Sequence, residues 1–533
     1  MKHLLPLLIA LVIGNPLFAQ IGSTHFENSK YKKMFVNETS TSRNLLGGFI
    51  GSTNDGFLIY EQIFKAGFVV NKFLLTIDYY DFNHVKKHTF QPFLTYGKED
   101  LKLVSTFISE NKIVLIASCY NPKDNANYLL GCHMDVKGKL LKEWTHLDTI
   151  YEKQKITPFY FGVILSTDKQ NFVVDHRKAK IEGQPVEISY KFFDLDFNRE
   201  KAVDLKPNIK VENFNTFQNL LDNDGNLFIF YDATEEFNKR LKSNSNIENP
   251  RAYYIEKEEN TCNELVIADK DKFYTGFHAN LSKEGRLFLG AFVFDNLNGN
   301  LKGYLRQEID RENFELVNPQ MLTMENANLE RSAGRLLNLN PGFKDLQFSN
   351  VKYLEDDDGN SWVIAEQQMV HTFSSTVTSG NVQRSVVRQD NYCKSLFVIR
   401  LNIEQEPIWF KTIPKRQFQE YDFRVNFTSY AATLKNHNLY LVFNDHRSNL
   451  NPNEKEDKSH MLVHWDLIKV NITRVEPNPK STIASQALFS PDIKRFWLML
   501  DFAHTLKNGD LLVVAERNEK YRPGTLRIES KMK

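Results

Sequence analysis

Residues 220–229 have the sequence Leu220-Leu221-Asp222-Asn223-Asp224-Gly225-Asn226-Leu227-Phe228-Ile229, which is a short apolar run, a polar turn and a second apolar run. Asp-Gly between two apolar runs is a strong hairpin signal, because these residues accept the positive φ that a tight turn needs. The pattern occurs eight times along the chain, for instance at Asn54-Asp55-Gly56 and at Asn508-Gly509-Asp510. A hairpin that recurs from end to end predicts one repeat architecture rather than several unrelated domains.

The spacing of the hairpins indicates the size of the repeat. Their second strands are 55 residues apart at the closest (Leu58 to Ile113) and 78 at the widest (Ser361 to Leu439). A second pair of apolar strands follows most hairpins, so each unit has four antiparallel strands. The sequence therefore predicts an all-β fold, a single β-propeller of eight blades. Seven blades are the alternative, if one of the hairpins is an insertion and not part of a blade of its own. Two β-sandwiches would not explain why the same hairpin recurs.

The ends of the repeat predict how the ring closes. The last unit lacks an outer strand, and the apolar stretch Lys33–Asn37 before the first unit can supply it. We therefore expect a ring closed between the N- and C-terminal strands. Polar insertions are expected near 233–250, 321–345, 368–392 and 446–460, and residues 326–339 have the apolar spacing of a short surface helix.

The N-terminus has the pattern of a secretory signal peptide. Met1-Lys2-His3 precedes an apolar run that ends at Gly14, and Ala19 precedes a polar residue. We predict that residues 1–19 are removed and that residues 20–533 form the propeller, exported to the periplasm or the extracellular space. The apolar run is shorter than the roughly 20 residues that span a bilayer, so no membrane span is expected.

Composition excludes some functions. Of 533 residues, 67 are Lys or Arg and 66 are Asp or Glu, and a net charge of +1 argues against an electrostatic nucleic-acid binder. The four cysteines lack metal-ligand spacing. A turn separates Cys119 from Cys132, so this pair either forms a disulfide across a hairpin or remains as two buried thiols. We expect buried free thiols at Cys262 and Cys393.

Several polar residues at strand ends are candidates for chemistry. The same number of residues separates the hairpin turn from an acidic strand-end residue in three units: Asp232, Glu366 and Glu516. These acids either form a ring of carboxylates near the propeller axis or mark the points where strands reach solvent. The triplet Asp175-His176-Arg177 recurs at residues 445–447, and a histidine beside an aspartate can orient an acid–base imidazole. No nucleophile motif accompanies either triplet, so shared repeat ancestry is the simpler interpretation.

Asp-rich turns such as Asp356-Asp357-Asp358-Gly359 do not follow the helix–loop–helix calcium pattern and are explained as hairpin turns. The same turn resembles the Asp-box of sialidase propellers, but it occurs once and Glu355 replaces its Ser or Thr. We predict no metal and no cofactor, with a divalent cation in the axial channel as an alternative.

Residues 350–530 resemble a family of uncharacterised secreted β-propeller proteins of Bacteroidetes. The matching segments include residues 363–367, 411–417, 441–445 and 515–517. The chain departs from the family where Asn518 replaces a glycine and Pro523 an aromatic residue. The resemblance implies an exported propeller and no known reaction.

The resemblance and the strand-end residues predict a polar patch on one face, formed by Glu366, Gln367, Lys415, Arg416, Gln417, Asn444, Asp445, Glu516, Arg517, Lys520 and Arg522. Mixed charges of this kind suit either polar recognition or a buried salt-bridge network. The leading hypothesis is a non-catalytic binding or scaffold protein of the cell envelope, with an envelope protein or a glycan as its partner. The alternative is a carbohydrate-active enzyme that uses two of these carboxylates, such as Glu366 and Glu516.

Overall fold

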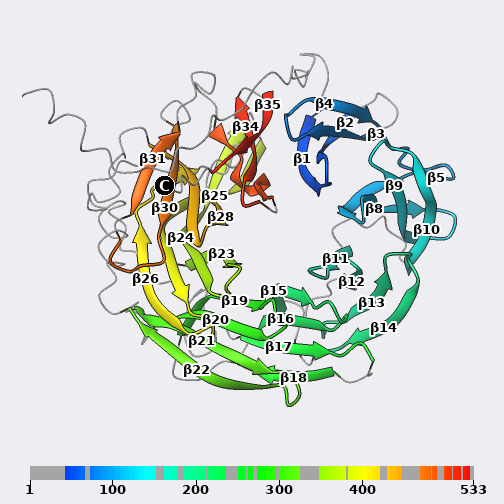
Figure 1. Cartoon of the computed structure of the whole chain (residues 1–533). Helices are drawn as coiled ribbons and strands as arrows, with labels where there is room; N and C mark the ends of the chain where they lie inside the picture. Colours follow the sequence, from blue (N-terminus) through cyan, green and yellow to red (C-terminus); the bar gives the residue numbers. More distant parts are fainter. Residues whose placement is uncertain are drawn as a thin grey trace, which may run out of the picture.

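The computed structural model describes residues 43–65, 72–151, 161–177, 185–207, 209, 214–233, 250–258, 262–267, 273–294, 301–324, 347–379, 382–419, 429–446, 468–481, 483–488, 497–506, 508–517 and 520–528. They form eight antiparallel sheets in a ring, which is a β-propeller (Figure 1). The all-β, eight-bladed prediction is confirmed, and the seven-bladed and two-sandwich alternatives are wrong. No helix of the described residues is both long and apolar enough to cross a membrane.

In the first four blades the strands pair in chain order. These blades are β1 (Arg43–Ser52), β2 (Gly56–Lys65), β3 (Lys72–Asp81) and β4 (Lys86–Phe90); β7 (Lys102–Ser109), β8 (Lys112–Asn121), β9 (Ala126–Asp135) and β10 (Leu140–Tyr151); β11 (Phe161–Leu165), β12 (Asn171–Arg177), β13 (Ile188–Asp194) and β14 (Arg199–Leu205); and β15 (Phe214–Leu221), β16 (Leu227–Ala233), β17 (Pro250–Ile255) and β18 (Cys262–Val266). Between blades 1 and 2, β5 (Thr95–Tyr96) pairs with β6 (Glu99–Asp100).

The next three blades have the same order. They are β19 (Phe273–Leu281), β20 (Leu287–Phe294), β21 (Leu301–Asp310) and β22 (Glu315–Thr323); β23 (Gln347–Glu355), β24 (Ser361–Ser379), β25 (Val382–Leu401) and β26 (Pro407–Ile413), with β27 (Gln417–Gln419) also on β25; and β28 (Ala431–Lys435), β29 (Asn438–His446), β30 (Ile468–Val475) and β31 (Ala484–Leu488). Figure 1 shows β11, β15, β19 and β23 near the axis and β14, β18, β22 and β26 at the rim.

Blade 8 closes the ring. Its strands are β32 (Trp497–Leu498), β33 (His504–Thr505), β34 (Leu511–Arg517) and β35 (Lys520–Leu526). Both β32 and β33 pair with β34, so they are two halves of one inner strand, interrupted by the 3-10 turn Leu500–Phe502. The predicted outer strand at 33–37 lies outside the described residues. Within the described chain, closure rests on packing of blade 8 against blade 1, where Met499 and Leu512 share a core cluster with Phe57.

The repeated turn has the conformation that its sequence requires. Gly225 has φ +89°, and its N–H donates to the Asp222 carbonyl oxygen at 3.2 Å. The Asp222 side chain completes the turn by accepting from the Asn226 N–H at 2.7 Å. Because glycine adopts this left-handed conformation without the steric cost of a Cβ, the Asp-Gly signal placed the hairpins correctly.

The hydrophobic core lies between neighbouring blades. Every residue of β20 is buried, since the middle strands are covered on both faces. Phe107 of blade 2 and Phe172 of blade 3 belong to one cluster, with ring centroids 6.4 Å apart. Outer strands such as β14 alternate between exposed and partly buried residues. Facing blades supply apolar surface to each other, which gives many of the 41 phenylalanines of the chain a place in the core.

The insertions differ from expectation at one place. Residues 368–392 were expected to form a polar loop, but β24 and β25 continue through them as a paired hairpin up to Ser379 opposite Val382. Alternating Thr and Val residues favour strands, which explains the difference. Residues 234–249, 325–346 and 447–467, including the predicted helix at 326–339, lie outside the described residues.

The cysteines form no disulfide. Cys119 and Cys132 are both buried on the adjacent strands β8 and β9, but Cys119 is opposite Tyr128 and Cys132 is opposite Leu115. Cys393 is buried as expected, whereas Cys262 is exposed. The expectation of burial was wrong for Cys262 because it begins the outer strand of its blade, at the rim of the ring.

Candidate functional site

The residues of the predicted patch lie on blades 6, 7 and 8. Glu366 and Gln367 are on β24, residues 415–417 connect β26 to β27, and Asn444 and Asp445 are near the end of β29. Glu516 and Arg517 are paired in β34 with Tyr521 and Lys520 of β35, and Arg522 is opposite Ala515. The side chains of Glu516, Arg517, Lys520 and Arg522 lie outside the described part.

Glu366 and Lys415 form a buried ion pair. Their side chains are 2% and 0% exposed, and the Lys415 ammonium binds the Glu366 Oε1. The same Nζ donates to Gln417 Oε1 at 2.7 Å and to the Ser429 carbonyl oxygen at 3.2 Å. Three acceptors satisfy the three donors of the ammonium, so neither charge is offered to a ligand.

This pair belongs to a network that joins three blades. Gln417 donates from Nε2 to the Asn444 carbonyl oxygen at 2.5 Å. Asn444 then donates from Nδ2 to the Leu498 carbonyl oxygen at 2.8 Å and accepts from the Leu498 N–H at 3.0 Å. We call Glu366, Lys415, Gln417 and Asn444 the buried polar network. Of the two interpretations of the patch, these residues fit a salt-bridge network that holds blades 6, 7 and 8 together.

A second buried cluster involves one of the repeated triplets. The partner of His176 is Asp148 of the preceding blade: His176 Nδ1 lies 2.9 Å from Asp148 Oδ2, and Lys191 also binds this carboxylate. Burial alone would raise the pKa of Asp148, but hydrogen bonds from His176 and Lys191 hold it below its usual value. The imidazole is thus part of an inter-blade ion cluster.

Asp356, Asp358 and His437 could together face a metal ion, and they lie in the turns of blades 6 and 7. His437 Nδ1 is 3.2 Å from Asp358 Oδ2, and Arg400 binds Asp356 Oδ2 at 3.1 Å. The other oxygen of Asp356 accepts the Asn360 N–H at 2.9 Å. A guanidinium and backbone donors already satisfy Asp356, so the group is explained as an ion-paired turn.

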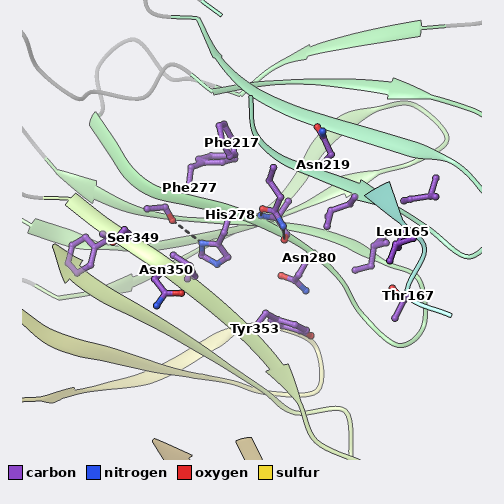
Figure 2. Close-up of a pocket in the computed structure, with 18 residues that line it drawn as sticks. Leu165, Thr167, Phe217, Asn219, Phe277, His278, Asn280, Ser349, Asn350 and Tyr353 are labelled. Atoms are coloured by element: carbon purple, nitrogen blue, oxygen red, sulfur yellow. Dashed lines mark hydrogen bonds between the residues drawn. The ribbon is translucent and has the colours of Figure 1, made fainter. Parts of the chain in front are cut away.

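A cavity of about 500 Å³ lies at the inner strands of blades 3 to 6. We call it the axial cavity; it is lined by Leu165, Thr167, Phe217–Leu221, Gly276–Leu281, Phe348–Val351 and Tyr353. Figure 2 shows Phe217 and Phe277 together at one end, with His278, Asn280 and Tyr353 along the wall. Its size falls within the range of roughly 300–1,000 Å³ typical of ligand sites.

β-Bulges shape the axial cavity. The register of β15 shifts between Thr216 and Gln218, so Phe217 is an extra residue opposite β16. The register of β19 shifts between Thr275 and His278, around Phe277. A bulge redirects the side chain at its position, which accounts for the presence of both rings in the cavity. The ring centroids are 5.3 Å apart at 72°, an edge-to-face pair.

His278 is a neutral part of the wall. Its Nδ1 lies 2.9 Å from the Gly276 carbonyl oxygen, and its Nε2 lies 2.9 Å from the Tyr304 hydroxyl. Burial lowers the pKa of His278 to about 3, and the nearby Arg306 charge adds to the effect. The imidazole is therefore uncharged at neutral pH, with Nδ1 donating and Nε2 accepting.

A second hollow of about 800 Å³ adjoins the axial cavity on the face that carries the hairpin turns. The two meet at the β11–β12 turn, where Thr167 lines the first and Asp168 lines the second. Asp510 in this hollow is paired with Lys435 at 2.8 Å. This hollow lies between the turns of blades 1, 2, 3 and 8.

The sequence analysis did not single out the axial cavity. One sequence feature could have pointed to it, because an aromatic residue lies at the same position of two neighbouring units. Phe217 lies five residues before Asp222, the first residue of its turn, and Phe277 lies five residues before Ser282, the first residue of the next. An aromatic residue on an inner strand is, however, equally compatible with packing between blades. Only the bulges, which depend on strand pairing, distinguish these two rings from core residues.

No family model and no curated protein matches the chain. Solved structures that align with it include prolyl oligopeptidase B from Galerina marginata, at TM-score 0.35 and 9% identity over 86% of this chain and 53% of that one. The β-propeller domain of the Trilobed protease from Pyrococcus furiosus aligns at TM-score 0.34 and 9% identity, covering 84% and 97% of the two chains. A polysaccharide lyase, an ulvan lyase, aligns at TM-score 0.34 and 8% identity, covering 78% and 90%. The chain spans about half the length of prolyl oligopeptidase B, and the likeness to these three structures is one of fold alone.

Proposed function

We propose that this chain is an exported, non-catalytic β-propeller that acts as a binding protein of the bacterial cell envelope, with its ligand in the axial cavity. The observation that carries the proposal is the cavity itself, which four successive blades line with phenylalanine and tyrosine rings and several uncharged polar groups. A mostly preformed hollow with apolar surface and a few polar groups is the usual form of a ligand site.

The burial of Glu366 favours binding over catalysis. A general acid or base must reach the substrate, but Glu366 is 2% exposed and bound to Lys415. The alternative, a glycan-cleaving enzyme, needs two carboxylates that flank the scissile bond, and Glu516 then lacks Glu366 as its partner. Among the described residues that line the axial cavity there is no carboxylate.

Export is the second part of the proposal and rests on the signal-peptide pattern of residues 1–19. Mass spectrometry of the secreted protein tests it, with a mature N-terminus at Gln20 as the expected result. A protein retained in the cytoplasm with residues 1–19 intact would contradict export without affecting the binding proposal.

Thr167 provides the test of the binding site because it is exposed and lines the cavity. A Thr167→Trp variant places an indole in the hollow, and Thr95→Trp on the exposed β5 is the matched control. Each immobilised protein is incubated with glycans and peptides released from bacterial envelopes, and retained molecules are identified by mass spectrometry. We expect one class to be retained by the wild type and Thr95→Trp but not by Thr167→Trp.

Two results would overturn the proposal. If no molecule is retained differently by Thr167→Trp, the axial cavity is not a binding site. If the wild type returns a retained glycan as shorter products, the protein is catalytic, and the enzyme alternative takes its place.

A further inference from the structure

Arg306 on β21 is a buried cation directly behind the wall of the axial cavity. It is 1% exposed, and it contacts two residues of the wall: its Nη1 donates to Asn280 Oδ1 at 2.7 Å, and its guanidinium lies 5.6 Å from the Tyr353 ring centroid. Its Nη2 donates to Gln405 Oε1 at 3.3 Å. These two acceptors are neutral amides, and Tyr304, whose side chain also hydrogen-bonds with Arg306, is a neutral phenol.

No carboxylate of the described residues forms an ion pair with Arg306. Glu355 accepts from the Tyr353 hydroxyl at 2.9 Å and from the Lys283 N–H at 3.1 Å, and Glu308 is paired with Arg286 at 2.7 Å. Buried arginines are almost always paired, because the cost of removing a charge from water is large. The site therefore has an excess positive charge within the described part of the propeller.

Asn280 connects this charge to the cavity. The residue is 6% exposed, its Oδ1 is held by Arg306, and its Nδ2 has no hydrogen-bond partner. In Figure 2 the Asn280 side chain lies in the cavity wall beside His278 and Tyr353. Because a hydrogen bond from a cation to the amide oxygen polarises the amide, the unpaired N–H groups become stronger donors toward an anionic acceptor.

The rest of the cavity indicates the body of the ligand. Phe217 and Phe277 present partly buried ring surface, whose negative faces attract the C–H groups of a sugar ring. Thr167 adds an exposed hydroxyl, which can both donate to and accept from a sugar hydroxyl. A peptide that adds a strand needs a regular sheet edge, and the bulges in β15 and β19 interrupt those edges at the cavity.

We infer that the axial cavity binds an acidic oligosaccharide, with a sugar carboxylate at Asn280 and a sugar ring against Phe217 and Phe277. This inference rests on the proposed binding function and names the class of its ligand. Arg306 supplies the charge through Asn280, so it is a positioning residue that does not touch the ligand itself.

The first experiment isolates the carboxylate. Binding of uronic-acid oligosaccharides (galacturonate, guluronate and glucuronate trimers) is measured by calorimetry beside the methyl ester of each, which keeps the ring and removes the charge. We expect one acid to bind about ten-fold more tightly than its ester, the size of effect that a charge a few ångströms away produces near a protein surface. Equal affinities would overturn the inference.

Asn280→Asp is the decisive variant because it places a carboxylate of the protein itself where the sugar carboxylate is proposed to bind. The new carboxylate would pair with Arg306, so we expect a protein that is more resistant to thermal unfolding and binds the acid at least about ten-fold more weakly. The exposed Asn436→Asp is the matched control and should change neither property. A variant that is stabilised but binds as tightly as the wild type would overturn the inference.

Other outcomes separate this inference from the proposed function. A neutral glycan or a peptide whose binding is lost in Thr167→Trp would overturn the acidic-sugar inference and leave the binding function intact. Binding of an acid that Thr167→Trp does not alter would place its site elsewhere and overturn the inference. Absence of any ligand that is sensitive to Thr167→Trp would overturn both.

Discussion

The buried ion pair of Glu366 with Lys415 allows a quantitative prediction for Lys415→Met. The substitution keeps the length of the side chain but leaves the Glu366 carboxylate, 2% exposed, without its cation. Gln417 Oε1 and the Ser429 carbonyl oxygen each lose a donor as well. Breaking a buried pair by removing one partner costs about 3–5 kcal/mol, because the remaining charge is neither hydrated nor paired. We expect the free energy of unfolding to fall by this amount.

The double variant Lys415→Met/Glu366→Leu identifies the origin of the cost. Gln417 Oε1 and the Ser429 carbonyl oxygen lose their donor in both variants, so the unpaired Glu366 carboxylate is the charge that the double variant removes. We therefore expect the double variant to be more stable than Lys415→Met alone. Lys112→Met is the surface control, since its pair with Glu110 is 3.6 Å long and 41% and 54% exposed. Exposed pairs contribute about 0–1 kcal/mol.

Urea unfolding at pH 7, followed by tryptophan fluorescence, measures all four proteins under one condition. The reasoning is refuted if Lys415→Met lies within about 1 kcal/mol of the wild type, which is the scale of a surface pair. It is refuted equally if the double variant is less stable than Lys415→Met, because the unpaired carboxylate would then not be the cause.

Four further predictions follow from other parts of the ring. Hydrogen bonds from His176 and Lys191 hold the pKa of Asp148 below its usual value despite burial. The ionised Asp148 therefore stabilises the fold fully above about pH 4, and this stabilisation disappears as pH falls through the lowered pKa. Asp148→Asn should lower the Tm at pH 7 by more than at pH 2, and an equal loss of Tm at both pH values would contradict this. Burial lowers the pKa of His278 to about 3, so on acidification the unfolded chain takes up a proton at His278 before the folded chain does. The free energy of unfolding therefore falls as pH drops from about 6.5 toward 3. In NMR the His278 ring resonance should show no titration above pH 4, and a midpoint near 6.5 would refute the buried neutral state. Gly290→Ala places a Cβ 2.1 Å from the Tyr304 hydroxyl oxygen and should cost about 1–3 kcal/mol in urea unfolding, whereas an unchanged midpoint would contradict the close packing. Dithiothreitol should leave the Tm unchanged, because no disulfide joins Cys119 to Cys132, and a lowered Tm would indicate one.

Local sequence signals predicted most of the fold. The turn at Gly225 works because glycine adopts positive φ, a property of the residue and its neighbours that needs no tertiary contact. Alternating apolar runs placed the strands, and their regular recurrence indicated a ring of eight units. The prediction of a loop at 368–392 was wrong. The polar residues of this segment indicated a solvent-exposed loop, but its Thr and Val residues also favour paired strands, and the segment forms a hairpin.

The site was predicted less well, because it depends on contacts between blades. Glu366 and Lys415 are 49 residues apart, and their pairing follows from the return of the β26–β27 connection to β24. The sequence pattern drew attention to Asp175 beside His176 and was interpreted as shared repeat ancestry, but it gave no sign of Asp148, 28 residues earlier, which His176 contacts. A sequence pattern shows that such groups are polar and lie at strand ends; it does not show which of them are buried together.

By itself the sequence determined the repeating hairpin and the polar character of strand ends, since each of these depends on residues within one unit; it favoured eight blades over seven, and the structure decided between them. Only the tertiary structure decided that Glu366, Lys415, Gln417 and Asn444 of the predicted patch form a buried network. It alone placed Asn280 and the two bulge phenylalanines in the wall of one cavity, with Arg306 behind Asn280. The physical reason is that burial and charge balance are properties of a residue's neighbours in space. In a closed ring, those neighbours come from adjacent blades, as with Asp148 and His176, which are 28 residues apart along the chain.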